Sequence, residues 1–358
     1  MKSKKIIIII FCILLIAPVI TWPVGKLFLN PEINENKNPM KFPEFSDSFV
    51  VDLESYFLEN APYRNLSIKL NLEVSKSFGK VYYKMLDSLK IPYYQIKNDV
   101  LFGKDGWLFY TRDNTMGDYA GTNLPTEAEL QSYLEKVVKV DNYFKSIGKK
   151  FAILVPPNKS QVYYEYVPNG IRVVSEIKKM DVIVEYIKEH SDVKITYCLD
   201  EMQQNKSDGQ VYFKYDSHWN NFGASQASKT FFSQLGVDIG AIEYAEKERP
   251  SGDLAYMIAE DNVVDIDYDT QIELPSGKSQ EKLAIVGDSF SYYMTDFVSK
   301  VFENYSIDTN STLYGNIGYS IDAINASDIF VLESVERFSA RIFGEGALLD
   351  QLIAYYNL

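Results

Sequence analysis

The spacing of apolar positions changes near the middle of the chain, and each change predicts a different element. Thr126 and Glu129 form a T-x-x-E capping box, which is typical of the first turn of a helix. Apolar residues then recur at helical spacing until Gly148. The next run, Phe151–Val155, is continuously apolar, as in a parallel strand buried on both faces. We therefore expect a helix followed by a buried strand.

The same alternation continues toward the carboxyl terminus. Residues 175–190 have the spacing of a second helix, and residues 193–198 that of a second strand. The segment KLAIVGDSF predicts a strand and a turn, followed by a helix from about Ser291, and residues 329–334 predict a further buried strand. Strands that alternate with helices indicate an α/β domain with a mainly parallel sheet flanked by helices.

Two further patterns precede this alternation. NDVLFGKDGWLFYTRD carries two β-rich runs on either side of Lys104-Asp105-Gly106, which predicts a hairpin. Farther toward the amino terminus, a segment that begins at Phe49 has apolar residues at helical spacing.

The amino terminus predicts a membrane anchor. The uncharged run Ile6–Gly25 is long enough to span a bilayer as a helix, and no A-x-A cleavage pattern follows it. We expect an uncleaved signal anchor over residues 1–25, with a cleaved signal peptide as the alternative. Lysines before the run place the amino terminus in the cytoplasm. A linker over residues 26–48 and one extracytoplasmic domain over residues 49–358 would follow, on a single-pass protein of the cell membrane.

Composition excludes some classes of protein. A hydrophobic content of 46% and an aromatic content of 14% exclude a disordered chain. A net charge of −13 argues against nucleic acid as a partner, because phosphate binding needs a basic surface. Cys12 lies in the predicted span and Cys198 in a predicted strand, so we expect no disulfide within the domain.

A candidate nucleophile follows one of the predicted strands. Ser289 lies in Gly-Asp-Ser directly after the run LAIV, where the next helix begins. Free backbone N–H groups at a helix start can stabilise an oxyanion. A serine hydroxyl still needs a neighbouring base to take its proton. Ser289 is therefore a candidate only if the chain supplies that base.

The segment YDSHWNNFGA supplies one. In an extended backbone, residues i and i+2 point to the same face, so Asp216 could orient the imidazole of His218. His218 would then act as the base for Ser289, and Asp216 would fix its tautomer, as in a Ser-His-Asp triad.

Other interpretations of these motifs stay open. Gly-Asp-Ser is a common turn sequence, and Asp-x-His is often a plain hydrogen-bonded pair or, occasionally, two metal ligands. A catalytic zinc site usually has three protein ligands, typically more than one His or Cys, and the only other histidine is His190. His190 ends a predicted helix, where the helix dipole favours a cation. A metal site would therefore need carboxylates, and we expect neither a metal ion nor a cofactor.

Five segments carry a family resemblance: GKDGWLFY, ILVPPNKSQVYYEYVP, DSHWNNFGA, SGDLA and IVGDSF. Together they resemble the alginate O-acetyltransferase family of AlgJ and AlgX and the related DHHW proteins, which are SGNH-hydrolase-like domains. The resemblance extends from about Phe49 to Phe338. It implies that Asp216, His218 and Ser289 are the catalytic residues. Ser217 stands where the family often has Thr or His, a change that leaves both chemical partners intact.

The order of the motifs bears on the fold. Ordinary SGNH hydrolases carry the serine before the Asp/His pair, whereas here the pair comes first. The resemblance therefore implies a flavodoxin-like sheet that is circularly permuted. A permutation is physically tolerable because domain termini often lie close together.

Further candidates lie beside these motifs. Trp219, Tyr292 and Tyr293 could stack on sugar rings, with core packing as the alternative. Asn158 and Asn316 are candidate oxyanion donors, with ordinary turn asparagines as the alternative. Glu333 and Arg337 resemble a family pattern at the last strand, and an ordinary ion pair would explain them equally well.

The chemistry expected from the resemblance is ping-pong acyl transfer. An acetyl group would pass through Ser289 onto hydroxyls of an exported or cell-surface polysaccharide. Acetyl-CoA is cytoplasmic, so the acetyl group would have to be handed across the membrane, and the resemblance implies a membrane-bound O-acyltransferase as the partner that does so. Two alternatives stay open: a carbohydrate esterase with the same triad, and a non-catalytic polysaccharide-binding assembly protein.

Overall fold

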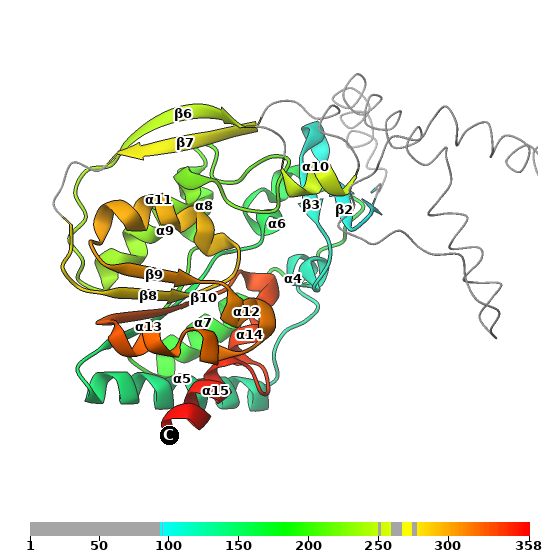
Figure 1. The fold of residues 1–358 in the computed structure, drawn as a ribbon. Coiled ribbons are helices and arrows are strands. Elements are labelled where there is room, and N and C mark those ends of the chain that lie inside the picture. The colour runs from blue at the N-terminus through cyan, green and yellow to red at the C-terminus, as the bar shows by residue number, and fades with distance from the viewer. Residues whose placement is uncertain (1–93, 95, 250–251, 259–266, 274–277) are drawn as a thin grey trace, which may run out of the picture.

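The fold is described from a computed structural model of the chain (Figure 1). The structure describes residue 94 and residues 96–249, 252–258, 267–273 and 278–358. The expected anchor at 1–25, the linker at 26–48 and the helix expected from Phe49 lie outside these residues. Within the described part, no helix has both the length and the apolar character needed to cross a bilayer.

A five-stranded parallel sheet forms the centre of the domain, which confirms the expected α/β class (Figure 1). Its strands are β4 (Lys150–Val155), β5 (Lys194–Tyr197), β8 (Leu283–Val286), β9 (Tyr305–Asp308) and β10 (Ile329–Glu333). They lie in the order β5-β4-β10-β8-β9. If β8 is taken as the first strand, this is the order 2-1-3-4-5 of a flavodoxin-like sheet. The chain thus reaches the fourth and fifth positions first.

Both faces of the sheet are buried because its strands are continuously apolar. Alternate side chains of a strand point to opposite faces, so Ala152 and Leu154 join one hydrophobic cluster while Phe151 and Ile153 join another. The first face is covered by α8 (Leu199–Asn205), α9 (Asn221–Gln234) and α11 (Phe290–Val301). The second is covered by α5 (Glu127–Ser146), α7 (Lys179–His190), α13 (Ile321–Ala326) and α15 (Leu348–Tyr356), as Figure 1 shows.

Side-chain capping fixes where two of these helices begin. The predicted capping box of α5 is present, because Thr126 Oγ1 accepts from Glu129 N–H and the Glu129 carboxylate accepts from Thr126 N–H. Helix α7 begins at Lys179, four residues after the expected start at 175. The Asp181 carboxylate accepts a hydrogen bond from Lys178 N–H and so caps the helix at that point.

The predicted hairpin is present and gains a short third strand. Strands β1 (Ile96–Lys97), β2 (Val100–Phe102) and β3 (Leu108–Tyr110) pair antiparallel. A turn of 3₁₀ helix at 104–106 joins β2 to β3, and Asp105 and Gly106 have φ angles of 52° and 80°. Asp and Gly tolerate this left-handed region better than most residues. Apolar residues of β2 and β3 pack against α10 (Asp253–Met257) and Tyr215.

A second hairpin was not expected from the sequence. Strands β6 (Glu243–Arg249) and β7 (Asp267–Glu273) pair antiparallel and lie at the edge of the domain (Figure 1). The side chains of β6 are mostly exposed, so this strand lacks the alternation of apolar and polar residues that predicts a half-buried strand. The remaining helices are α4 (Thr115–Ala120), α6 (Lys159–Val162), α12 (Asn310–Tyr314) and α14 (Ala340–Phe343), with 3₁₀ turns at 164–166, 317–319 and 336–338.

Candidate active site

Ser289 lies in the tight turn between β8 and α11. Gly287 opens this turn, and a Cβ atom there would collide with the Glu333 carboxylate and with Ser291, so a larger residue would displace the turn. The buried Asp288 carboxylate accepts from Phe290 N–H at 2.9 Å and from a backbone N–H just beyond β10. The turn is therefore held to the end of the neighbouring strand, and β8 and β10 flank the point where a flavodoxin-like sheet binds its ligands.

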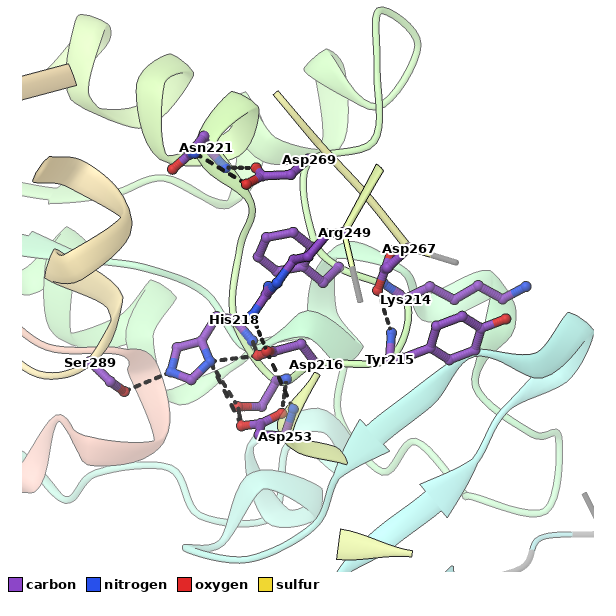
Figure 2. A network of polar contacts seen from close by, with 12 residues as sticks. Lys214, Tyr215, Asp216, His218, Asn221, Arg249, Asp253, Asp267, Asp269 and Ser289 are labelled. Carbon is purple, nitrogen blue, oxygen red and sulfur yellow. Dashed lines mark hydrogen bonds and ion pairs between the residues drawn. The ribbon is translucent and has the colours of Figure 1, made fainter. Parts of the chain in front are cut away.

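The three predicted catalytic side chains are brought together. His218 Nε2 lies 2.7 Å from Ser289 Oγ, and His218 Nδ1 lies 2.6 Å from Asp216 Oδ1 (Figure 2). Ser289 and His218 are 71 positions apart in the chain. The arrangement of a hydroxyl, an imidazole and a carboxylate in one line of hydrogen bonds is that of a catalytic triad.

The local backbone at this pair differs from the expected one. Residues 213–218 form a loop closed by a bridge between Tyr212 and Trp219, not an extended strand. Asp216 Oδ1 accepts from His218 N–H at 3.0 Å as well as contacting the imidazole. Asp side chains commonly bond a backbone N–H two positions on in this way. The i, i+2 spacing thus orients the imidazole through a turn.

Burial and neighbouring charges set the ionisation of the pair. Burial alone would raise the pKa of Asp216, but the hydrogen bond and charge of His218 and the Arg249 guanidinium hold that pKa far below its ordinary value. Burial would lower the pKa of His218, whereas the Asp216 hydrogen bond and the charges of Asp216 and Asp253 raise it, with a net rise. The imidazole is therefore a stronger base than an ordinary histidine, and Asp216 stays ionised.

Trp219 does not lie where it could stack on a sugar ring. Its side chain is 0% exposed and belongs to the hydrophobic core, so the core-packing alternative describes it. Its Nε1–H donates to Phe290 O at 2.9 Å. Trp219 thus joins the loop that carries His218 to the helix that follows Ser289.

The two tyrosines lie at different depths. Tyr292 is 61% exposed, and its hydroxyl is hydrogen-bonded to Thr309 Oγ1 at 2.7 Å. Tyr293 is half-buried, and its ring centroid lies 5.4 Å from that of His218. Tyr292 is accessible to a ligand, while Tyr293 packs against the imidazole of His218.

A pocket of about 260 Å³ opens above Ser289 and His218. Arg337 lines it together with Tyr110, Arg112, Met257 and Phe338. The Arg337 side chain is largely buried, and its Nε–H has no hydrogen-bond partner among the described residues. Arginine is always positively charged, so Arg337 brings a positive charge to the wall of this pocket.

The two asparagines do not donate to this pocket. Asn158 is 0% exposed, and its Nδ2–H donates to Asp118 at 3.0 Å while its Oδ1 accepts weakly from Arg337 at 3.4 Å. Asn158 therefore supports Arg337. Asn316 is exposed and accepts from Gly318 N–H in a 3₁₀ turn, as an ordinary turn asparagine does.

Glu333 and Arg337 form no ion pair within the described part of the chain, so the ion-pair interpretation does not explain them. Glu333 is fully buried, and one of its oxygens accepts from Asp288 N–H at 3.1 Å. Burial, with the charge of Asp288, raises its pKa well above the ordinary value. Glu333 therefore supports the turn before Ser289.

Two charged residues at this site have no predicted role from the sequence. Arg249 contacts Asp216, and Asp253 lies 3.7 Å from His218 Nδ1 (Figure 2). Asp253 belongs to the segment SGDLA, whose resemblance to the family was the one available signal. Arg249 ends a strand of mixed charges, and nothing in that pattern distinguishes it.

Asp216, His218 and Asp253 also form a group that could hold a metal ion, because one ligand atom of each lies within 4.8 Å of the others. Each is already engaged by protein groups, however. Arg249 supplies a cation to Asp216, and Ser217 donates to Asp253. The donor set therefore suits a hydrogen-bonded triad with a second carboxylate, and the expectation of no metal ion stays a prediction.

The chain is similar to known proteins of one family. Residues 100–307 match the family profile of the SGNH hydrolase-like domain of the acetyltransferase AlgX, and no curated protein is significantly similar. The O-acetyltransferase domain of Pseudomonas putida AlgJ is 23% identical, with 67% of this chain and 91% of that chain covered and a TM-score of 0.49. A DHHW family protein from Eubacterium siraeum DSM 15702 is 16% identical, with 71% and 96% covered and a TM-score of 0.47. Pseudomonas aeruginosa AlgX is 15% identical, with 70% and 66% covered and a TM-score of 0.48.

Proposed function

This chain belongs to the family of SGNH hydrolase-like acetyltransferase domains represented by AlgX, and on that premise we propose that it is a polysaccharide O-acetyltransferase. It moves an acetyl group through an acyl-serine onto hydroxyls of an exported or cell-surface polysaccharide. The observation that carries the proposal is the contact of His218 Nε2 with Ser289 Oγ at 2.7 Å, in line with Asp216.

The first half-reaction acetylates Ser289. His218 Nε2 takes the hydroxyl proton while Ser289 Oγ attacks the carbonyl carbon of the acetyl donor. The tetrahedral intermediate then collapses, and its bond to the donor oxygen breaks. The imidazolium returns the proton to that oxygen, which leaves as a hydroxyl. Asp216 stays ionised and stabilises the imidazolium between these two transfers.

The oxyanion of the intermediate needs donors that are already in place. At the start of α11, Phe290 N–H and Ser291 N–H are both used by Asp288. Ser289 N–H has no acceptor among the residues that the structure describes, so it is the backbone donor available there. Arg337, whose Nε–H is buried and unpartnered in the described part, supplies a positive charge in the same pocket.

The second half-reaction passes the acetyl group to a sugar. His218 takes the proton of an acceptor hydroxyl, whose oxygen attacks the acyl carbon. The bond from that carbon to Ser289 Oγ then breaks, and the imidazolium returns the proton to Oγ. Tyr292 lies three positions after Ser289 in the chain and is exposed, so we propose that it stacks on a sugar ring. Water could attack in place of the sugar, and this would make the protein an esterase with the same residues.

The source of the acetyl group is a further part of the proposal. The expected anchor at 1–25 would place the domain outside the cell, where acetyl-CoA is absent. We propose that a membrane-bound O-acyltransferase hands the acetyl group to Ser289. We also propose that the protein is a single-pass protein of the cell membrane.

Product analysis distinguishes transfer from hydrolysis. The protein is incubated with an activated acetyl ester and a mixture of oligosaccharides, and acetylated sugar and free acetate are both measured. Transfer predicts acetylated oligosaccharide that depends on Ser289, with Ser289→Ala reducing the rate by a factor on the order of 10⁴ or more. Free acetate without acetylated oligosaccharide would identify an esterase. If Ser289→Ala formed as much product as the wild-type protein, both the transferase and the esterase proposals would be contradicted.

A further inference from the structure

The loop that carries Asp216 and His218 is held by charged residues from one later part of the chain. At its start, the Asp267 carboxylate accepts from Lys214 N–H at 3.1 Å and from Tyr215 N–H at 2.9 Å. At its end, Asp269 accepts from the N–H of Asn221 at 3.0 Å (Figure 2). Both aspartates lie on β7 and are nearly buried. The hairpin of β6 and β7 therefore fixes the two ends of the catalytic loop.

The centre of the loop meets Arg249, the last residue of β6. Arg249 Nη2 lies 3.1 Å from Asp216 Oδ2, whereas Asp216 Oδ1 faces His218. The guanidinium stacks on the ring of Phe213 at 3.9 Å from its centroid, which limits its movement. The two oxygens of Asp216 thus have separate partners, and the carboxylate cannot rotate without losing an ion pair.

On the other side of the loop lies Asp253, the first residue of α10. Its carboxylate accepts from Ser217 N–H at 2.7 Å and from Ser217 Oγ–H at 2.6 Å. One of its oxygens lies 3.7 Å from His218 Nδ1. A Cβ atom at the preceding Gly252 would collide with Asp216, so this segment packs directly against the catalytic pair.

We propose that Arg249 and Asp253 are positioning residues for acyl transfer. Arg249 pairs with the second oxygen of Asp216 and brings a positive charge to the catalytic pair, and Asp253 holds the loop backbone and places a second negative charge beside the imidazole. This inference rests on the proposed function, because it concerns the same Ser289. Both residues act through Asp216 and His218, and they carry opposite charges.

The opposite charges have opposite effects on the base. Removing the positive charge of Arg249 makes the surroundings of His218 more negative and favours the imidazolium. Removing the negative charge of Asp253 favours the neutral imidazole. Among the described residues, six others face His218: Asp216, Ser217, Ser289, Phe290, Tyr293 and Arg337. Neither substitution removes any of them.

The test measures how fast phenylmethylsulfonyl fluoride modifies Ser289 in the full chain between pH 5 and pH 10. The rate follows the neutral fraction of His218, so the midpoint of the curve of rate against pH reports the pKa of the His218 imidazole. Arg249→Gln should move the midpoint up by about one unit, and Asp253→Asn should move it down by a similar amount. Glu248→Gln, on the same strand as Arg249 and exposed, should leave it unchanged.

Two midpoints that stay at the wild-type value, or that move in the same direction, would overturn the inference. Arg249→Lys keeps the charge and should restore the wild-type midpoint, even if Arg249→Gln proves too unstable to assay. If Arg249→Lys also raises the midpoint by about one unit, the charge of Arg249 does not set it and the proposal fails. A wild-type Ser289 that does not react at all would instead contradict the proposed function.

Discussion

At the scale of single residues, the site depends on how the protein charges one imidazole. His218 faces one carboxylate by a direct hydrogen bond and a second at 3.7 Å, and its exposed fraction is only 14%. Burial disfavours the imidazolium, and the two carboxylates favour it more strongly. The structure therefore makes the base stronger and also delays its deprotonation as pH rises.

This balance predicts the pH dependence of acylation. His218 acts as a base only when neutral, and its raised pKa means that it becomes neutral at a higher pH than an ordinary histidine. The rate of Ser289 acetylation by an activated ester should rise with pH through a midpoint above about 6.5. A midpoint below that value would contradict the electrostatic description of the site.

The residues that sequence reasoning found and missed differ in a physical way. Ser289, His218 and Asp216 lie in short motifs whose spacing reflects local geometry, a turn after a strand and an i, i+2 pair. Arg249 and Asp253 act through contacts with a loop more than thirty positions earlier. No local pattern records such contacts, so the structure was needed to find them.

At the scale of elements, the proposed catalytic residues belong to separate segments that must be held together. Trp219 connects two of them, because its indole is buried and donates to Phe290 O at the start of α11. His218 and Ser289 are the neighbours of these two residues in the chain. A change at Trp219 should therefore affect both the stability of the core and the alignment of the catalytic groups.

Substituting Trp219 by Phe tests this connection. The variant keeps an aromatic ring in the core but loses the hydrogen bond, which should lower the free energy of unfolding by about 1 kcal/mol or more. The midpoint temperature of thermal unfolding and the acetylation rate should both fall. A variant of unchanged stability with a raised KM for oligosaccharide would show that Trp219 binds sugar.

The elements themselves were predictable where burial imposes a pattern. Strands β4, β8 and β10 are buried on both faces and were visible as apolar runs. Strand β9 contains fewer apolar residues than these strands and is mostly half-buried. Strand β6 is charged and exposed. Their pairing with neighbouring strands determines them, and that pairing is not visible in their own residues.

At the scale of the whole molecule, the strand order explains why distant motifs meet. Ser289 follows β8 and Arg337 follows β10, and these adjacent strands form the switch point of a 2-1-3-4-5 sheet. In Figure 1, α10 and the hairpin of β2 and β3 lie beyond that end of the sheet, and the hairpin of β6 and β7 lies over helices α9 and α11. The parallel sheet thus positions Ser289, the proposed nucleophile, and the β6–β7 hairpin and α10 support His218, the proposed base.

The expected anchor makes a separate prediction about the whole chain. It lies outside the described residues, so it stays a prediction. On cell fractionation, the full chain should be recovered with membranes, and a chain that lacks residues 1–25 should be recovered in the soluble fraction with Ser289 still reactive. Recovery of the full chain as a soluble protein would contradict the anchor and leave the catalytic proposal intact.

Identifying the acyl-enzyme tests the proposed acyl transfer through Ser289 most directly. The protein is exposed to an activated acetyl ester, quenched in acid, and analysed by intact mass and peptide mapping. We expect a single acetyl group on Ser289. This acetyl group should be lost when a sugar acceptor is added before the quench, and it should not form in His218→Ala. Acetylation at other residues only, or equal labelling of Ser289→Ala, would contradict the proposal.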